Sequence, residues 1–195
     1  TTQATGNWVI ESGLADINIG SGAIVNSNGN NITTKTVTNA GTLTLAAGST
    51  LTFTDASGCG FGDSTGTFNS LGASGNANTV TSSAACAPSN FWDFQCNMPI
   101  NADYTTFEKH IRFFPSNSIG TNGINIDNCT FRLNQNGYLC VNFSTITTVD
   151  RFSSFTNNTI TGGTYGLATA SYTGYDNIVI STAGGSNELR VEDGH

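Results

Sequence analysis

The sequence predicts an all-β protein built as a β-solenoid, in which successive coils of the chain stack their strands into sheets. Residues 42–45 and 50–54 alternate Thr with Leu or Phe, and this period of two is typical of a strand with one buried face. Short patterns with Asn at corners also return along the chain at the spacing of solenoid coils. A Thr-rich β-sandwich is the alternative fold, because it would have the same composition.

The composition excludes several other classes of protein. Thr, Asn, Gly and Ser make up nearly half of the 195 residues, charged residues make up 10%, and the formal net charge is −7. Six basic residues are too few for a nucleic-acid-binding surface. The sequence also lacks an apolar run of about 18 residues, so insertion into a membrane is not predicted. The residues typical of coiled coils are scarce. Twelve Phe, with many Val, Ile and Leu, supply the core that a disordered chain lacks.

A short internal repeat marks the N-terminal part. The unit Gly-Thr-Leu-Thr-Leu at residues 41–45 returns as Gly-Ser-Thr-Leu-Thr-Phe at residues 48–53. Corners that contain Gly or Asn separate the alternating runs, because these residues adopt positive φ angles at little cost. We therefore expect N-terminal repeats over about residues 7–56.

A longer repeat marks the C-terminal part. The pattern Ile-Asp-Asn-Cys-Thr-Phe at residues 126–131 is echoed by Phe-Thr-Asn-Asn-Thr-Ile at residues 155–160, and more weakly by residues 175–180. The interval between the copies is typical of solenoid coils and predicts C-terminal coils over about residues 116–192. Asn at successive corners would form hydrogen-bonded ladders along the stack.

The middle of the chain, about residues 57–115, is less regular. Apolar residues there follow a spacing of 3, 4 and 3, which predicts one short helix near residues 104–114. Thr105 with Glu108 resembles a capping box, and Pro115 would end the helix. The residues on the apolar face are Tyr104, Phe107, Ile111 and Phe114. A strand over residues 110–114 is the competing interpretation, and no linker divides residues 1–195 into two domains.

Two segments carry a resemblance to known proteins. Residues 125–160, with N-x-T-[FI] corners after Gly-Ile and Gly-Tyr openings, resemble the right-handed parallel β-helix repeats of the pectate-lyase-like superfamily. Residues 6–8 and 41–53 look like the β-solenoid stalks of secreted bacterial and archaeal surface proteins. The resemblance implies a parallel β-helix exposed outside the cell. It implies no particular activity, because this fold serves lyases, hydrolases, adhesins and fibres.

Cysteines and sequons agree with a secreted or cell-surface location. The chain begins without Met or an apolar signal, so it looks like a processed protein or a piece of a longer one. Five cysteines allow two disulfides, and the alternative is that some of them are small buried apolar residues. The disulfide candidates are Cys86 with Cys96 and Cys129 with Cys140. The four N-x-[ST] glycosylation candidates are Asn31, Asn128, Asn142 and Asn157.

The sequence does not predict an enzyme. Polysaccharide cleavage needs clustered carboxylates or a base with charge neutralisation, and the thirteen acidic residues here are dispersed. No cofactor is expected, and bound calcium near Asp55 and Asp63 is the one metal worth considering. A saccharide-binding groove is the alternative to a set of solvated charges that prevent aggregation. Its candidate residues are Lys109, Arg112, Asp127, Arg132, Asp150 and Arg151.

The T-x-T runs suggest a further possibility. A flat Thr array orders water and binds ice when T-x-T recurs at the same place in successive coils. The copies that start at Thr36, Thr42 and Thr50 are too close together for this, so we expect them on successive faces of one or two coils.

The predicted function is therefore structural. We expect a non-enzymatic extracellular subunit, such as a filament, surface layer or adhesin stalk, whose partners are copies of itself and surface glycans. Trp8 and Ile10 lie in a strand-like run that would be donated to a neighbouring subunit or form the first strand of the domain. The alternative function is a secreted β-helix protein that binds or cleaves polysaccharide.

Overall fold

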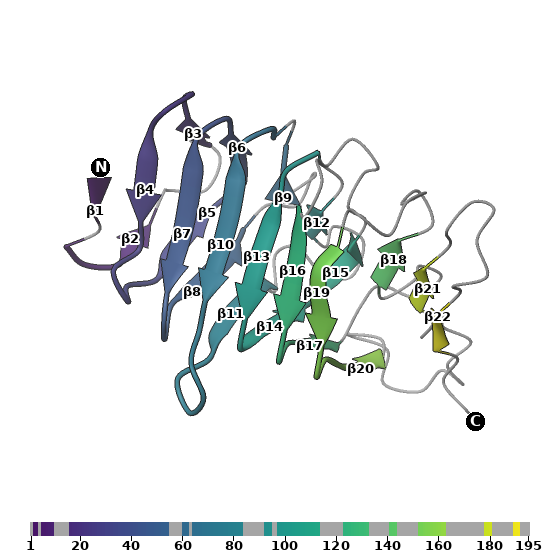
Figure 1. Ribbon diagram of the computed structural model, residues 1–195. Helices are drawn as coiled ribbons and strands as arrows, with labels where there is room; N and C mark the ends of the chain where they lie inside the picture. Colours follow the sequence, from purple (N-terminus) through teal and green to yellow (C-terminus); the bar gives the residue numbers. More distant parts are fainter. Residues whose placement is uncertain are drawn as a thin grey trace.

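The protein is a parallel β-solenoid. The computed structural model describes residues 2–3, 5–9, 16–54, 60–62, 64–83, 92–94, 97–113, 123–132, 141–143, 152–162, 178–180 and 189–191. These residues contain strands and no helix, and most strands stack in three parallel sheets, here called A, B and C (Figure 1). The predicted all-β parallel β-helix is thereby confirmed, and a β-sandwich, which is built from antiparallel sheets, is excluded. The right-handed sense of the winding stays a prediction.

Sheet A contains the first strand of each coil. Its seven strands pair in parallel throughout. In spatial order they are β1 (Thr2–Gln3), β4 (Ile24–Asn26), β7 (Thr42–Ala46), β10 (Thr67–Leu71), β13 (Ile100–Asp103), β16 (Ile124–Asp127) and β19 (Phe152–Thr156).

Sheet B contains the second strand of each coil, and its seven strands are again all parallel. In spatial order they are β2 (Trp8–Val9), β5 (Ile32–Thr34), β8 (Thr50–Phe53), β11 (Asn78–Ser82), β14 (Thr105–Glu108), β17 (Thr130–Arg132) and β20 (Thr159–Gly162).

Sheet C contains the third strand of the first five coils and closes the cross-section. Its strands are β3 (Ile17–Ile19), β6 (Thr36–Asn39), β9 (Gly60–Phe61), β12 (Trp92–Phe94) and β15 (His110–Phe113). The described strands of the middle region, β9 to β15, thus continue the same three sheets as the N-terminal repeats. The middle differs from its flanks in coil length and not in architecture.

The repeats seen in the sequence set the register of the coils. Ile126 pairs with Phe155, and Thr130 pairs with Thr159, so the interval between the two C-terminal copies is one coil of the solenoid. Coil length varies along the stack: Val25 pairs with Leu43, and Phe68 pairs with Ile100. The unit at 41–45 and its copy at 48–53 lie instead on adjacent faces of one coil, in β7 and β8.

A small fourth sheet lies near the C-terminus (Figure 1). It contains β18 (Val141–Phe143), β21 (Ile178–Ile180) and β22 (Leu189–Val191). β18 and β21 are parallel, whereas β22 runs antiparallel to β21. The weak copy at 175–180 therefore does not continue the coils of sheets A and B in its described part, since β21 pairs with β18 instead.

The predicted helix near residues 104–114 is wrong. Residues 105–108 and 110–113 are the strands β14 and β15, and residue 114 lies outside the described residues. Tyr104 and Lys109 adopt positive φ angles of 42° and 56°, which turn the chain at successive corners. A right-handed helix cannot contain such angles. Thr105 begins β14 and Glu108 ends it, so the two residues do not form a capping box.

The core follows from the alternation within each strand. Residues with large apolar side chains point inward, among them Leu43 and Phe68 in sheet A, Phe53 in sheet B and Phe61 in sheet C. The rings of Phe53 and Phe61 meet edge to face at 5.5 Å, and those of Phe61 and Phe68 lie 5.0 Å apart. One phenylalanine from each sheet therefore meets in the interior, where burial of aromatic surface stabilises the fold.

A column of small polar side chains fills the inner corner between sheets A and B. Its members are buried: Ser27, Ser49, Asn78, Thr105 and Cys129. Ser27 Oγ and Ser49 Oγ share a hydrogen bond of 2.6 Å, and Asn78 Oδ1 accepts one from Ser49 N at 3.0 Å. The sharp corner leaves too little room for large side chains, and the hydrogen bonds satisfy the polar groups that burial removes from water.

Candidate functional site

The outer face of sheet B presents two columns of threonine side chains. The long threonine column crosses five successive coils in register, and the short threonine column crosses three beside it. The long column is Thr50, Thr79, Thr106, Thr130 and Thr159, and the short column is Thr33, Thr52 and Thr81. Thr159 is exposed and the others are half-buried, as expected for outward side chains in a flat, closely paired sheet.

Most of these hydroxyls have no hydrogen-bond partner among the described residues. Among the described contacts of these eight threonines, only the Thr81 hydroxyl takes part in protein hydrogen bonding: it donates to Glu108 Oε1 at 3.0 Å, and Ser82 O lies 3.4 Å from the same hydroxyl oxygen. The other threonines of the two columns therefore offer a methyl group and a hydroxyl without a partner among these residues, repeated from coil to coil.

The inner side of sheet B holds this surface in place. Residues that alternate with the threonines are fully buried, including Leu51, Val80, Phe107 and Phe131. Because each of these side chains packs in the core, the register of the outward residues cannot slip without moving apolar groups into water.

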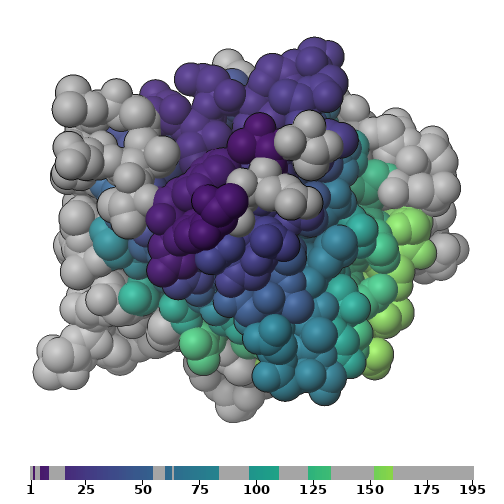
Figure 2. All heavy atoms as spheres, turned by 90° about the vertical axis from the view of Figure 1, so that its left-hand side faces the viewer, coloured from purple at the N-terminus to yellow at the C-terminus, as the bar shows by residue number. Residues whose placement is uncertain are grey.

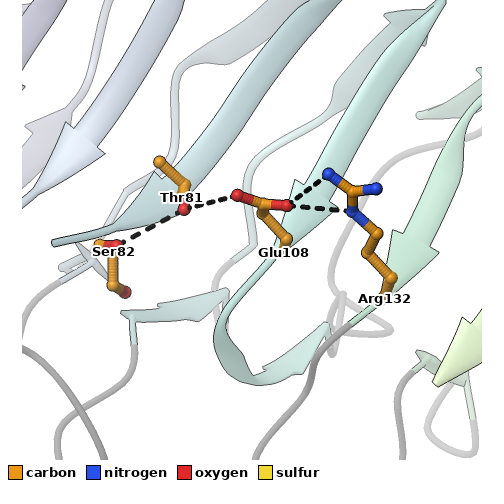
Figure 3. Close-up of polar contacts among 4 residues, drawn as sticks. All are labelled: Thr81, Ser82, Glu108 and Arg132. Atoms are coloured by element: carbon orange, nitrogen blue, oxygen red, sulfur yellow. Dashed lines mark hydrogen bonds and ion pairs between the residues drawn. The ribbon is translucent and has the colours of Figure 1, made fainter. Parts of the chain in front are cut away.

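In the described strands of sheet B, charged residues lie only where the sheet ends at its corner with sheet C. Arg132 donates from Nε to Glu108 Oε2 at 2.9 Å, and its Nη2 lies 2.7 Å from the same oxygen (Figure 3). Glu108 is 12% exposed and Arg132 is 50% exposed, so the carboxylate is nearly buried while its partner faces solvent. The two charges neutralise each other, and the short threonine column ends beside this ion pair.

The structure places the described saccharide-groove candidates on different elements. Lys109 lies at the corner beside Glu108 and Arg132, whereas Asp127 ends β16 on sheet A, at the opposite end of the sheet B strands. Arg112 lies in β15 of sheet C. Asp150 and Arg151 lie outside the described residues. The described candidates therefore lie on three sheets, and a saccharide site formed by any of them stays a prediction.

Asp127 is instead part of the outer corner between sheets A and B. Its Oδ1 accepts hydrogen bonds from Ser154 Oγ at 2.6 Å and from Thr156 N and Oγ1 at 2.8 and 2.6 Å. Desolvation by itself would raise the pKa of Asp127, but these hydrogen bonds outweigh it and hold the pKa below its ordinary value. The carboxylate therefore links neighbouring coils as an acceptor.

Cys129 is a free cysteine in the structure and not half of a disulfide. Its thiol donates to Asp127 O at 3.1 Å, and burial raises its pKa to about 12. It occupies the buried corner column where other coils place Ser, Asn or Thr, which explains a small, weakly polar side chain there. Cys86, Cys96 and Cys140 lie outside the described residues.

The sequons occupy different environments. Asn31 and Asn157 are exposed, whereas Asn128 is half-buried and donates from Nδ2 to Asp103 Oδ1 at 2.9 Å. Asn128 and Asn157 have φ angles of 54° and 55° at the same corner of successive coils, as Asn tolerates. Asn142 lies in β18.

Asparagine ladders at the corners confirm the expected hydrogen bonding between coils. Asn31 N donates to Asn7 Oδ1, Thr50 N donates to Asn31 Oδ1, and Cys129 N donates to Asn158 Oδ1, each at 2.9 Å. Each amide oxygen accepts from the backbone of a neighbouring coil, so hydrogen bonds join the coils at these corners as well as along the strands.

Trp8 lies in β2, the first strand of sheet B. Its side chain is half-buried and packs on the core, and its backbone N–H donates to Asn31 O at 2.7 Å. Among the described residues, β1, β2 and β3 each end their sheet, and the view from this end shows the first coil in front of the later ones (Figure 2). Ile10 lies outside the described residues.

No metal-binding or membrane-spanning feature is found among the residues that the structure describes. No three His, Cys, Asp or Glu side chains converge there in a way that would hold a metal ion. No helix in these ranges is long and apolar enough to cross a membrane. Asp55 and Asp63, the calcium candidates, lie outside the described residues.

The geometry thus defines a parallel β-solenoid with one threonine-rich face. No family model matches the chain, and neither curated proteins nor solved structures gave a match. The threonine columns were missed at the sequence level, although a signal exists: Thr-Val-Thr at residues 79–81 repeats the pattern of Thr-Leu-Thr at residues 50–52.

Proposed function

We propose that the protein is a non-enzymatic, extracellular structural subunit that associates with copies of itself through the ends of its solenoid. The observation that carries this proposal is the strand order of the sheets. At one end of the described stack, β1, β2 and β3 are the outermost strands, and at the other end β19 and β20 are outermost in sheets A and B.

The two ends are complementary. All pairs within sheets A and B are parallel, and β19 and β20 have no further partner among the described strands. They therefore present the kind of edge that β1 and β2 of the next copy require. Contact between two different ends is heterologous, and such contacts generate open filaments when the rotation between copies does not close a ring. Unpaired strand edges are the usual sites of such addition.

The low charge of the chain supports close association. Charged residues make up 10% of the chain, and Glu108 and Arg132 neutralise each other. Stacked copies therefore bring few like charges together, and the polar side chains supply hydrogen bonds between copies.

An extracellular location is part of the proposal. The exposed sequons at Asn31 and Asn157 support it, because glycosylation acts on secreted proteins. We also propose a wider relationship to the pectate-lyase-like superfamily, which the three parallel sheets and the asparagine corners support.

Electron microscopy and sedimentation of the purified protein test the proposal. We expect filaments or a size distribution that shifts upward with concentration. A single monomeric species at every concentration would contradict self-association.

A backbone variant at the β2 edge sharpens the test. Trp8 N–H points toward β5, since it bonds Asn31 O, so Val9 N–H points to the open edge by alternation along the strand. Val9→Pro removes that donor from an edge position where proline is tolerated. Val9→Thr keeps the N–H and is the matched control. We expect assembly to be lost only in Val9→Pro, with unchanged circular dichroism and unfolding temperature.

A further inference from the structure

We propose that the outer face of sheet B binds ice. This function goes beyond self-association and rests on a different surface. The feature that carries it is the two-dimensional array formed by the long and short threonine columns, which contain five and three threonines in register.

The array has the two repeats that an ice surface requires. Neighbouring threonines in a column are separated by the distance between paired strands, about 4.8 Å, and Thr50 and Thr52 are separated by two residues of a strand, about 6.6 Å. Both distances are near lattice repeats of hexagonal ice. Thr79 and Thr81 repeat the same pair on the next coil, so the match extends in both directions.

The chemistry of the array suits crystalline water better than other ligands. Ice and liquid water offer the same hydrogen bonds, so only a rigid and repetitive surface distinguishes them. The hydroxyls of Thr50, Thr79 and Thr106 have no protein partner among the described residues, and each stands beside a methyl group that orders the adjoining water. The columns contain no aromatic ring on which a sugar would stack.

Sheet A provides an internal contrast. Its outward side chains bond to one another, as Asn69 Nδ2 does to Thr44 Oγ1 at 3.3 Å and Asn125 Nδ2 does to Asn101 Oδ1 at 2.8 Å. Its outer face also contains Asp103 and the exposed apolar side chain of Leu71. A mixed, internally bonded surface does not present one repeated group, so we assign ice binding to sheet B alone.

Ice is grown slowly from a dilute solution of the purified protein, and the fraction of the protein that enters the ice is measured. Thermal hysteresis is measured on the same protein. We expect the protein to enter the ice and to depress the freezing point below the melting point. Exclusion from ice without hysteresis would overturn the proposal. Binding to microcrystalline cellulose in place of ice would overturn it too.

Two matched variants locate the surface. Thr79→Tyr places a bulky ring in the middle of the long column, and Thr42→Tyr makes the same change at a half-buried outward position of β7 in sheet A. Tyr favours strands, so both variants are expected to fold, which circular dichroism checks. We expect Thr79→Tyr to lose ice binding and Thr42→Tyr to retain it. Equal losses would overturn the assignment to sheet B. Assembly, measured without ice, is expected to be unchanged in both variants.

Discussion

Phe107 and Phe131 lie face to face in successive coils, with ring centroids 5.0 Å apart and planes only 13° from parallel. They pair in register in β14 and β17, and both are fully buried. This stack is the inner counterpart of Thr106 and Thr130, which pair in the same two strands on the outer side. The packing of the core and the regularity of the outer surface thus depend on one register.

Phe107→Ala is expected to lower the free energy of unfolding by about 3–5 kcal/mol, because it removes a buried ring and leaves a cavity. Urea denaturation followed by circular dichroism measures the change. Thr106→Ala, one residue away on the outer side, is the control and is expected to change stability by about 0.5 kcal/mol or less. Similar losses in both variants would contradict the assigned inward and outward faces.

Asn78→Ala is expected to destabilise the protein by about 3 kcal/mol, since it leaves several buried groups without partners. Asn78 accepts from Ser49 N and donates to Leu45 O and Ser70 Oγ at 3.0, 3.1 and 3.2 Å. Thermal and urea unfolding measure the effect. Asn69→Ala, which removes a half-buried amide on the outer face, serves for comparison and is expected to be nearly neutral. A loss of stability in Asn69→Ala as large as that in Asn78→Ala would contradict the role assigned to Asn78.

Gly66→Ala is expected to destabilise by roughly 1–3 kcal/mol through overpacking. A Cβ at Gly66 would overlap the backbone of Gly41, which cannot move aside without breaking the pairing of neighbouring coils. Gly20→Ala is the matched control, because nothing lies within 4 Å of its added Cβ. A gain of about 0.4–1 kcal/mol is expected there, since Ala restricts the unfolded chain. Equal decreases in the unfolding temperature of the two variants would show that the contact between residue 66 and Gly41 does not cause the destabilisation.

Cys129 is expected to resist alkylation by iodoacetamide at pH 8 in the folded protein and to react after unfolding. Burial raises the pKa of its thiol to about 12 from an ordinary 9.0, so the reactive thiolate is not formed. The folded state holds the proton more tightly, and this contribution to stability is full below pH 9 and decreases as pH rises toward 12. Mass spectrometry of the Cys129 peptide measures labelling, and Cys129→Ser isolates the pH effect. Rapid labelling of native protein would refute the buried position.

The sequence predicted the fold where its pattern is local and repeated. The echo between residues 126–131 and 155–160 is the coil register itself, because Asn corners and alternating strands recur together. For the groove candidates, closeness in the sequence does not mean closeness in the fold, and saccharide binding by these residues stays a prediction. Asp127 and Arg132 are close in sequence, but the corner at Asn128 and Cys129 puts them on different sheets.

The helix prediction failed because Tyr104 and Lys109 adopt positive φ angles. Tyr and Lys normally avoid such angles, so nothing in the sequence predicts them. The threonine columns were hidden by unequal coils. The coil from Thr50 to Thr79 is longer than the coil from Thr79 to Thr106, so no single period aligns them. Only the pairing of strands brings them into one column.

The turn between β10 and β11 shows how such coils tolerate extra length. Residues 72–77 project beyond the stack as a small hairpin, in which Ala73 and Asn76 bond to each other and Gly75 has a φ angle of 79° (Figure 1). Because β10 and β11 keep their pairing with the coils on either side, the projection does not disturb the sheets. Foreign peptides inserted between Ser74 and Gly75 would therefore be displayed at a defined position along the axis of the solenoid. The coil that carries the insertion sets that position, so the protein is a scaffold for peptide display.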